Sequence, residues 1–266
     1  EDYHYCGIPG GEACQECYNK RAFFGIYPCF SQPDWIEHWK AFFAECAEIR
    51  SFSQDTLSRV EQCFGKELPL TLVPHRVNYM LPIHKEHTHS DTITIGLLGD
   101  MIHHKGSDLV EACLKEIEEK KLNIRFVLIG QTTGCSLEKY KNIYQTGRYH
   151  VSDLPRLIYE HDIDIFLVAS VWPETFSYTT SEVMQMGLPL ASFDLGAPAE
   201  RIKTYEKGLI LSERTAPVVL DEITDFVVNK LALKASEKQV DRKKIVYIAE
   251  YISFSSRYFL TSSLSK

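Results

Sequence analysis

The sequence predicts an α/β protein built on a Rossmann-like parallel sheet with helices on both faces. The first observation is an alternation, from Thr92 onward, of short apolar runs with longer segments of helical character. The second is that runs such as Ile124–Ile129 and Ile163–Ala169 are largely apolar, which is typical of strands buried on both faces. A smaller strand, helix and strand pattern before residue 76 predicts a partial α/β domain in front of this sheet.

Length and charge limit the classes of protein to which this chain can belong. It has 266 residues, of which 44% are hydrophobic, and a formal net charge of −7, with Arg242–Lys244 as its one basic block. This composition supplies a core for one large or two small domains and argues against nucleic-acid binding. No apolar run approaches the roughly 20 residues of a membrane span. The chain begins with Glu1 and shows no signal peptide, but we expect a fragment, so this absence carries little weight.

Four cysteines near the N-terminus form the pattern C-x7-C-x2-C-x11-C. Cys14 and Cys17 are separated by two residues, so both thiolates can turn toward one ion. With Cys6 and Cys29 they are candidate ligands of a structural zinc. The alternatives are unpaired thiols in a cytosolic protein and disulfides in a secreted one. We expect bound metal or a thiol cluster rather than disulfides.

The rest of the N-terminal part predicts a βαβ unit beside an aromatic helix. A short strand is expected at Glu48–Phe52, then a helix capped by Ser53 and ending before Gly65, then a strand at Leu70–Val73. Residues 34–48 predict a helix whose apolar stripe faces the core, because apolar side chains recur there at three- and four-residue intervals. This stripe consists of Trp35, Ile36, Trp39, Phe42, Phe43 and Cys46.

Residues 76–91 are expected to form a solvated linker, because short polar stretches commonly join domains. They contain His84, His87 and His89, for which a metal site is the alternative. His75, directly before the linker, is expected to be structural.

Beyond the linker, each apolar run ends at a glycine-containing or polar loop, which sets the expected element order. Strands are expected at residues 92–98, 124–129, 143–146, 163–169, 188–193 and 209–211, and helices at 107–120, 137–142, 153–161, 177–186, 216–234 and 241–259, with a further helix whose first turn contains Pro198.

The stretch around Glu174 and Glu182 is the strongest indication of a ligand site. Seven residues separate the two glutamates, and eight positions of a helix span roughly 12 Å, about the reach of a nucleotide sugar from its sugar to its ribose. The start of the helix Ser177–Met186 lies between them and offers unpaired N–H groups to a diphosphate. Glu182 would then accept hydrogen bonds from ribose hydroxyls, and Glu174 from sugar hydroxyls. The alternative is that both are surface glutamates on an ordinary helix.

The run Trp172–Ile202, WPETFSYTTSEVMQMGLPLASFDLGAPAERI, resembles the donor-binding motif of family-4 retaining glycosyltransferases. These enzymes have the GT-B fold of two Rossmann domains. The match is closest to the bacterial branch for O-antigen and rhamnan-type polysaccharides, and it extends from about Tyr5 to Leu211. The resemblance implies sugar transfer with retention and no metal or other cofactor for donor binding. It also implies an upstream acceptor-side half, which would supply a histidine and, for the cysteine-rich segment, a fourth metal ligand.

The resemblance also assigns roles to single residues. Lys105, directly before Gly106, matches a family lysine and is, with Glu174, a candidate catalytic residue that stabilises the leaving diphosphate. Many family members have an arginine where this chain has Asp100, and most have a glycine at the position of Ser177. Besides Glu182, the expected donor-binding residues are Thr175, Phe176, Ser177, Tyr178, Gly196, Tyr149 at the base and Leu154 behind it. Tyr149 and Leu154 also fit ordinary packing.

The predicted organisation is a partial acceptor-side domain (1–75) with the cysteine-rich segment, the linker (76–91), the donor-binding domain (92–236) and a C-terminal helix and tail (237–266). The expected partners are a nucleoside-diphosphate sugar, a glycan or lipid-linked glycan acceptor and the missing N-terminal part of the same protein. The expected location is the cytoplasm, free or at the surface of the inner membrane. Taken alone, this chain is expected to bind donor without transferring sugar.

Two other functions remain open. One is a non-catalytic nucleotide-sugar binding module of a larger assembly. The other is a sugar-phosphate isomerase, which would need a histidine near the glutamates, and no histidine follows His161 in the sequence.

Overall fold

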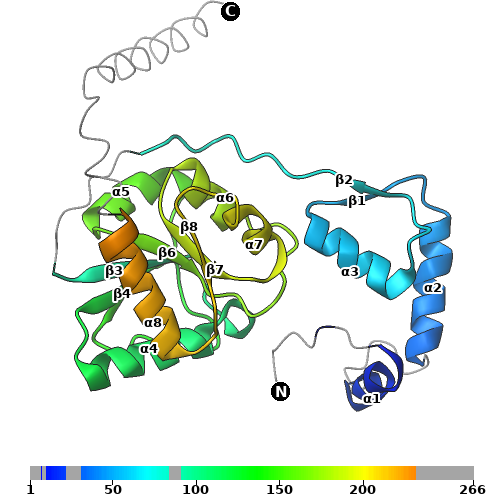
Figure 1. Cartoon of the computed structure of the whole chain (residues 1–266), viewed down its shortest axis with the longest axis horizontal. Coiled ribbons are helices and arrows are strands. Elements are labelled where there is room, and N and C mark those ends of the chain that lie inside the picture. The colour runs from blue at the N-terminus through cyan, green and yellow to red at the C-terminus, as the bar shows by residue number, and fades with distance from the viewer. Residues whose placement is uncertain (1–6, 8–9, 22–30, 84–90, 232–266) are drawn as a thin grey trace, which may run out of the picture.

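The computed structural model describes residues 7, 10–21, 31–83 and 91–231. Figure 1 shows a large unit around one sheet, a small unit around β1 and β2, and an extended chain segment that joins them. Within the described ranges, no helix is long and apolar enough to cross a membrane.

The large unit contains a six-stranded sheet whose strand order is β5-β4-β3-β6-β7-β8. Every neighbouring pair is parallel. In the order of the chain this is 3-2-1-4-5-6, the Rossmann arrangement, so the strand order reverses between β3 and β6. The predicted fold class is confirmed. The strands are β3 (Ile93–Leu98), β4 (Ile124–Ile129), β5 (Ile143–Gln145), β6 (Ile165–Val168), β7 (Leu190–Phe193) and β8 (Gly208–Leu211).

Both faces of this sheet are buried because alternate side chains of each strand enter different cores. Phe126 and Leu128 of β4 belong to one core cluster, whereas Val127 and Ile129 belong to the other. The helices α4 (Ser107–Lys120) and α8 (Ala216–Asp225) cover the first face, and α5 (Leu154–Glu160), α6 (Tyr178–Gln185) and α7 (Gly196–Ile202) cover the second (Figure 1).

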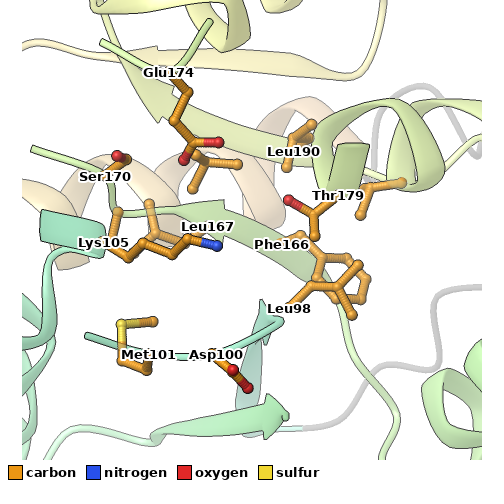
Figure 2. A pocket seen from close by; sticks show the side chains of 13 residues that line it. Leu98, Asp100, Met101, Lys105, Phe166, Leu167, Ser170, Glu174, Thr179 and Leu190 are labelled. Atoms are coloured by element: carbon orange, nitrogen blue, oxygen red, sulfur yellow. The ribbon is translucent and has the colours of Figure 1, made fainter. Parts of the chain in front are cut away.

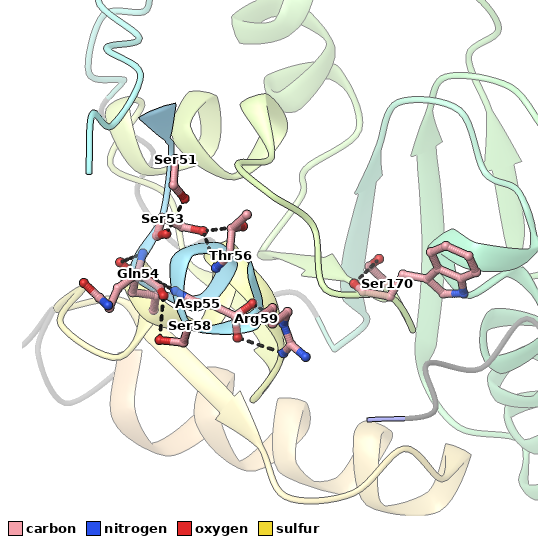
Figure 3. Close-up of polar contacts among 10 residues, drawn as sticks. Ser51, Ser53, Gln54, Asp55, Thr56, Ser58, Arg59 and Ser170 are labelled. Atoms are coloured by element: carbon pink, nitrogen blue, oxygen red, sulfur yellow. Dashed lines mark hydrogen bonds and ion pairs between the residues drawn. The ribbon is translucent and has the colours of Figure 1, made fainter. Parts of the chain in front are cut away.

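The small unit is the predicted βαβ: β1 (Ile49–Ser51) pairs in parallel with β2 (Leu70–Leu72), and α3 (Gln54–Phe64) connects them. Ser53 caps α3 as predicted, because its Oγ accepts a hydrogen bond from the N–H of Thr56 at 3.2 Å (Figure 3). The helix α1 (Gly11–Arg21) comes before α2 (Gln32–Ala44) in the chain.

The prediction that the aromatic stripe of α2 forms a core is wrong, since no residue of this helix is buried. Trp39 contacts Phe43, and Phe43 makes an edge contact with Phe64 of α3 at 5.1 Å between ring centroids. Phe42 remains 56% exposed. The reason is size: a two-stranded sheet and one helix offer too little apolar surface to cover the stripe.

The predicted helix at residues 137–142 is also absent, and turns connect β4 to β5 there. Leu137 is fully buried, and the side-chain amide of Asn142 donates to the carbonyl oxygen of Leu114 in α4. These anchors fix six residues between two strands, too few for a stable helix of their own. Near the C-terminus, α8 passes into a π-helix, Phe226–Leu231. The other residues of the helices predicted at 216–234 and 241–259 lie outside the described chain.

The first half of the expected solvated linker packs on α6. Val77 and Met80 are buried, the N–H of Met80 donates to Gln185 Oε1 at 3.3 Å, and the N–H of Ile83 donates to the carbonyl oxygen of Met186 at 3.0 Å. Apolar side chains at positions 77, 80 and 83 explain the contact, and the average polarity of the segment did not reveal them. The three histidines of the second half lie outside the described residues.

The two units also meet where α3 faces α7. The carboxylate of Glu200 in α7 accepts hydrogen bonds from the N–H groups of Gln54 at 3.2 Å and Asp55 at 3.0 Å. These are the first N–H groups of α3, which have no partner within the helix. The larger unit thus caps a helix of the smaller one.

Candidate functional site

A pocket lies at the switch point between β3 and β6, on the side of their carboxyl ends (Figure 2). Its empty volume is about 420 Å³. Ligands of open parallel sheets bind at this place. The pocket is lined by Leu98, Asp100, Met101, Lys105, Phe166, Leu167, Val168, Ala169, Ser170, Glu174, Thr179, Val183 and Leu190.

The short helix η2 (His103–Lys105) brings Lys105 to this pocket. Gly106 follows with φ of 87°, and a Cβ atom at this position would lie 2.1 Å from the carbonyl oxygen of Ala169. Glycine is therefore required for the loop to lie against the end of β6. The N–H of Val171 donates to the carbonyl oxygen of His104 at 3.1 Å. In Figure 2 the Lys105 ammonium and the Glu174 carboxylate extend into the same space.

Glu174 is positioned by the start of α7. The N–H of Ala197 donates to the carbonyl oxygen of Glu174 at 2.9 Å. Gly196 has φ of 67°, and a Cβ atom there would lie 2.7 Å from the Glu174 nitrogen. Gly196 therefore acts by letting two backbone segments approach. It does not line the pocket.

The first turn of α6 supplies free donors beside Glu174. The N–H groups of Ser177, Tyr178, Thr179 and Thr180 have no hydrogen-bond partner among the described residues. Ser177 has φ of 66°, a backbone region that favours glycine. Its Oγ accepts a hydrogen bond from the Thr180 hydroxyl at 2.9 Å, which is a local reason for serine here. A helix start with unpaired N–H groups favours an anion.

Arg201 of α7 organises this turn, and the sequence reasoning missed it. Its guanidinium donates to the carbonyl oxygens of Phe176 and Ser177, to Ser181 Oγ and to the carbonyl oxygen of Ala197. It also lies 4.5 Å from the centre of the Phe176 ring. Burial lowers the pKa of Arg201 to about 10, so it remains a cation at neutral pH. Only the position of Arg201 within the family-like run could have indicated this role.

Glu182, in the middle of α6, is not among the residues that line the pocket. It is only 5% exposed, and its Oε1 accepts a hydrogen bond from the Tyr79 hydroxyl at 2.6 Å. Tyr149 lies close enough to Glu182 to sense its charge. Burial raises the pKa of Tyr149 to about 12, and the negative charges of Glu182 and Asp100 add to this shift. Leu154 is fully buried in the core and has no exposed surface for a ligand.

The remaining predicted donor residues differ in exposure. Thr175 is exposed, Phe176 is buried and Tyr178 is 51% exposed. The ring of His75 stacks on Phe52 at 3.8 Å and meets the edge of Phe176 at 5.0 Å. His75 therefore has a packing role, and it connects the small unit to the donor motif.

A second histidine also lies near the motif. The ring of His104 lies 5.9 Å from that of Trp172. Both His75 and His104 precede the glutamates by many residues, so distance along the chain was a poor guide to which histidines lie close to them.

The formal charge of the pocket lining is slightly negative. Asp100 and Glu174 carry negative charges, and Lys105 carries the one positive charge among the lining residues. Figure 2 shows Asp100 on the side opposite Glu174. Attraction of an anion to this pocket therefore depends on Lys105 together with the N–H groups of α6.

Two of the four candidate zinc ligands can be described. Cys14 and Cys17 are free thiols on α1, three positions apart and so on one face of the helix. Cys6 and Cys29 lie outside the described residues. Within the described part of the chain, no group of three or more His, Cys, Asp or Glu side chains is arranged to hold a metal. The zinc site stays a prediction.

Comparison with solved structures shows the same fold in glycosyltransferases. Sucrose-phosphate synthase from Thermosynechococcus elongatus has a TM-score of 0.59 at 15% identity, over 74% of this chain and 53% of that one. HepE from Anabaena, solved with UDP and glucose, has a TM-score of 0.60 at 14% identity, over 76% of this chain and 59% of that one. TarM from S. aureus, solved with UDP, has a TM-score of 0.59 at 16% identity, over 85% of this chain and 46% of that one. This chain thus spans about half the length of these proteins.

Sequence comparison adds the family. A search of curated proteins found no match. The family described as "Glycosyl transferases group 1" matches residues 92–229, slightly more than half of the chain. These residues run from the start of β3 into the π-helix after α8 and include the pocket and both glutamates. The chain therefore belongs to the group 1 glycosyltransferases.

Proposed function

We propose that this chain is the donor-binding part of a retaining glycosyltransferase that moves a sugar from a nucleoside-diphosphate sugar to a glycan acceptor. The observation that carries the proposal is the set of groups at the switch point. Lys105 and Glu174 line one pocket, and the unpaired N–H groups at the start of α6 lie, in sequence, between Glu174 and Glu182. HepE, a protein of the same fold, was solved with UDP and glucose, which supports a nucleoside diphosphate as the ligand class.

Each group has a role in this proposal. The α6 N–H groups and Lys105 bind the diphosphate and stabilise the charge that develops on it when the sugar leaves. Glu174 accepts hydrogen bonds from the sugar hydroxyls, and Glu182 accepts them from the ribose. Arg201 holds the turn so that its N–H groups point toward the ligand, and Tyr149 contributes a wall near the base.

Sugar transfer requires more than the described units. GT-B enzymes bring two Rossmann domains together over the substrates, and alignment of donor and acceptor supplies much of the rate. The small unit has only two short strands. We propose that the 266 residues alone bind donor without turnover, and that further N-terminal sequence supplies the acceptor side. The acceptor is proposed to be a glycan or lipid-linked glycan in bacterial O-antigen-like synthesis on the cytoplasmic side.

A binding module without turnover is the second candidate, supported by the pocket lining, in which Lys105 is the one cation beside the carboxylates of Asp100 and Glu174. A sugar-phosphate isomerase is disfavoured because neither His75 nor His104 is among the residues that line the pocket.

The proposal is tested by measuring the melting temperature of the chain with a panel of nucleoside diphosphates. A ligand present at one hundred times its dissociation constant stabilises the fold by about 2.7 kcal/mol. We expect one base to stabilise the protein most. If no nucleoside diphosphate shifts the melting temperature, the proposal is refuted.

Two further assays test whether the chain alone transfers sugar and whether the cysteine-rich segment binds zinc. A coupled assay for release of nucleoside diphosphate, with sugar donors and glycan acceptors, is expected to show no turnover. Rates near 1 s⁻¹ or above, within the usual range of enzymes, would contradict the need for a further half. Elemental analysis with thiol counting tests the proposed zinc at Cys6, Cys14, Cys17 and Cys29, and absence of both metal and free thiols would refute it.

A further inference from the structure

Tyr79 lies outside the family-matched region and reaches a residue of the proposed donor site. It lies 103 residues before Glu182, in the segment after β2, and its hydroxyl donates to Glu182 Oε1 at 2.6 Å. The side chain of Tyr79 is 53% exposed. Its hydroxyl nevertheless ends on a carboxylate that is almost completely buried, so the contact is not an ordinary surface pair.

The backbone around Tyr79 is fixed on both sides. Val77 and Met80 are buried, and the N–H of Met80 donates to Gln185 Oε1 in α6. Glu182 and Gln185 are three positions apart, so both lie on the face of α6 that the segment covers. Tyr79 therefore reaches Glu182 from a segment that is itself held on the same helix.

Glu182 depends on this contact. A buried carboxylate is costly unless hydrogen bonds satisfy it. Among the described residues, the Tyr79 hydroxyl is the only hydrogen-bond partner of the Glu182 side chain, and no cation within the described ranges pairs with it. The O–H···O distance of 2.6 Å lies in the range of charge-assisted hydrogen bonds. Burial and the charge of Glu182 raise the pKa of Tyr79, so the phenol remains a donor.

The contact leaves lone pairs of the same carboxylate without a partner among the described residues. An ionised carboxylate has about four lone-pair positions, of which the Tyr79 hydroxyl takes one. A ribose presents two neighbouring hydroxyls, which need two acceptor positions. Because the hydrogen bond at Oε1 already fixes the orientation of the Glu182 carboxylate, this side chain loses less conformational entropy when the ribose binds.

We propose that Tyr79 is a positioning residue of the ribose site. Its hydroxyl holds the Glu182 carboxylate so that the remaining lone pairs accept hydrogen bonds from the two ribose hydroxyls. This inference rests on the proposed nucleoside-diphosphate binding and adds a residue from the segment between the two units to the donor site.

The test is a calorimetric titration of the full chain with two ligands: the nucleoside diphosphate that stabilises it most and the 2′,3′-dideoxy form of that nucleotide. The variant is Tyr79→Phe. Tyr144→Phe is the matched control, because Tyr144 is 56% exposed on the edge strand β5 and its hydroxyl has no partner among the described residues. We expect Tyr79→Phe to weaken the ribonucleotide about tenfold, as for a lost hydrogen bond to a charged group, and to leave the dideoxy form unchanged.

Other outcomes overturn the inference in distinct ways. Tighter ribonucleotide binding by Tyr79→Phe would mean that the hydroxyl blocks the site. An equal loss for both nucleotides would mean that Tyr79 acts only on the local fold. Unchanged affinity for the ribonucleotide would remove Tyr79 from the site. If the wild-type chain binds neither nucleotide, the proposed function fails and this inference fails with it.

Discussion

Replacing Arg201 is expected to loosen the turn before α6, whose N–H groups are the proposed binding site of the diphosphate. The guanidinium donates to two carbonyl oxygens of this turn, to Ser181 Oγ and to the carbonyl oxygen of Ala197. In Arg201→Lys the charge stays, but the planar fork is lost and an ammonium cannot reach all four acceptors. Hydrogen bonds to a charged group contribute about 1.5–3 kcal/mol each and are not additive. Losing two of them is expected to cost about 2–4 kcal/mol.

Urea unfolding followed by circular dichroism measures this loss. Arg148→Lys is the matched control, because Arg148 is exposed and makes no interaction with the described residues; such substitutions usually change stability by less than about 0.5 kcal/mol. If Arg201→Lys unfolds within 1 kcal/mol of Arg148→Lys, Arg201 does not hold the turn. In Arg201→Lys the affinity for nucleoside diphosphate is expected to fall as well.

Three further predictions concern charge. Asp100→Asn is expected to strengthen nucleoside-diphosphate binding in calorimetric titration, because a unit charge at roughly 10 Å in an effective dielectric near 20 contributes about 1.7 kcal/mol; unchanged affinity would place the diphosphate elsewhere. Glu200→Ala is expected to cost about 1–2 kcal/mol of local stability, seen as faster hydrogen exchange at the Gln54 and Asp55 amides, and unchanged exchange would contradict the cap. Hydrogen bonds from Lys139, Tyr140 and Lys115 lower the pKa of Glu111 to about 2. The ionised Glu111 carboxylate therefore contributes to the free energy of unfolding above pH 4.5, and this contribution is lost as the pH falls toward 2. It amounts to about 1 kcal/mol after solvent screening. Urea midpoints of wild type and Glu111→Gln should converge over this range, and a constant difference would refute the assignment.

Local sequence patterns predicted the larger unit well because its central strands, such as β3, β4, β6 and β7, are largely buried. The run Ile124–Ile129 is a strand with the predicted bounds, and the helix Ser107–Lys120 also has the predicted bounds. Periodicity predicts the direction of a side chain, but it does not tell whether another element covers that side. The stripe containing Trp39 and Phe42 has helical spacing and yet remains partly or largely exposed.

The site was predictable only where the chemistry lies within one continuous segment. Glu174 and Glu182 were found because they lie on one run, which the family resemblance strengthened. Tyr79 was not found, because it lies 103 residues before Glu182 and only packing brings the two together. Arg201 lies in the same run as the glutamates, but its role depends on how α7 packs against the turn before α6, which local patterns do not show. Neither residue belongs to a spacing pattern that sequence reasoning could read.

We propose that a nucleoside-diphosphate sugar binds with its ribose at Glu182 and its transferred sugar at Glu174. The most direct measurement is calorimetric titration of a nucleoside diphosphate and the matching nucleotide sugar against wild type, Glu182→Ala and Glu174→Ala. Loss of a hydrogen bond to a charged group costs about 1.5–3 kcal/mol, or roughly 10- to 150-fold in affinity. We expect Glu182→Ala to weaken both ligands by this factor, and Glu174→Ala to weaken only the nucleotide sugar. Equal affinity of wild type and Glu182→Ala for the nucleoside diphosphate would contradict the account.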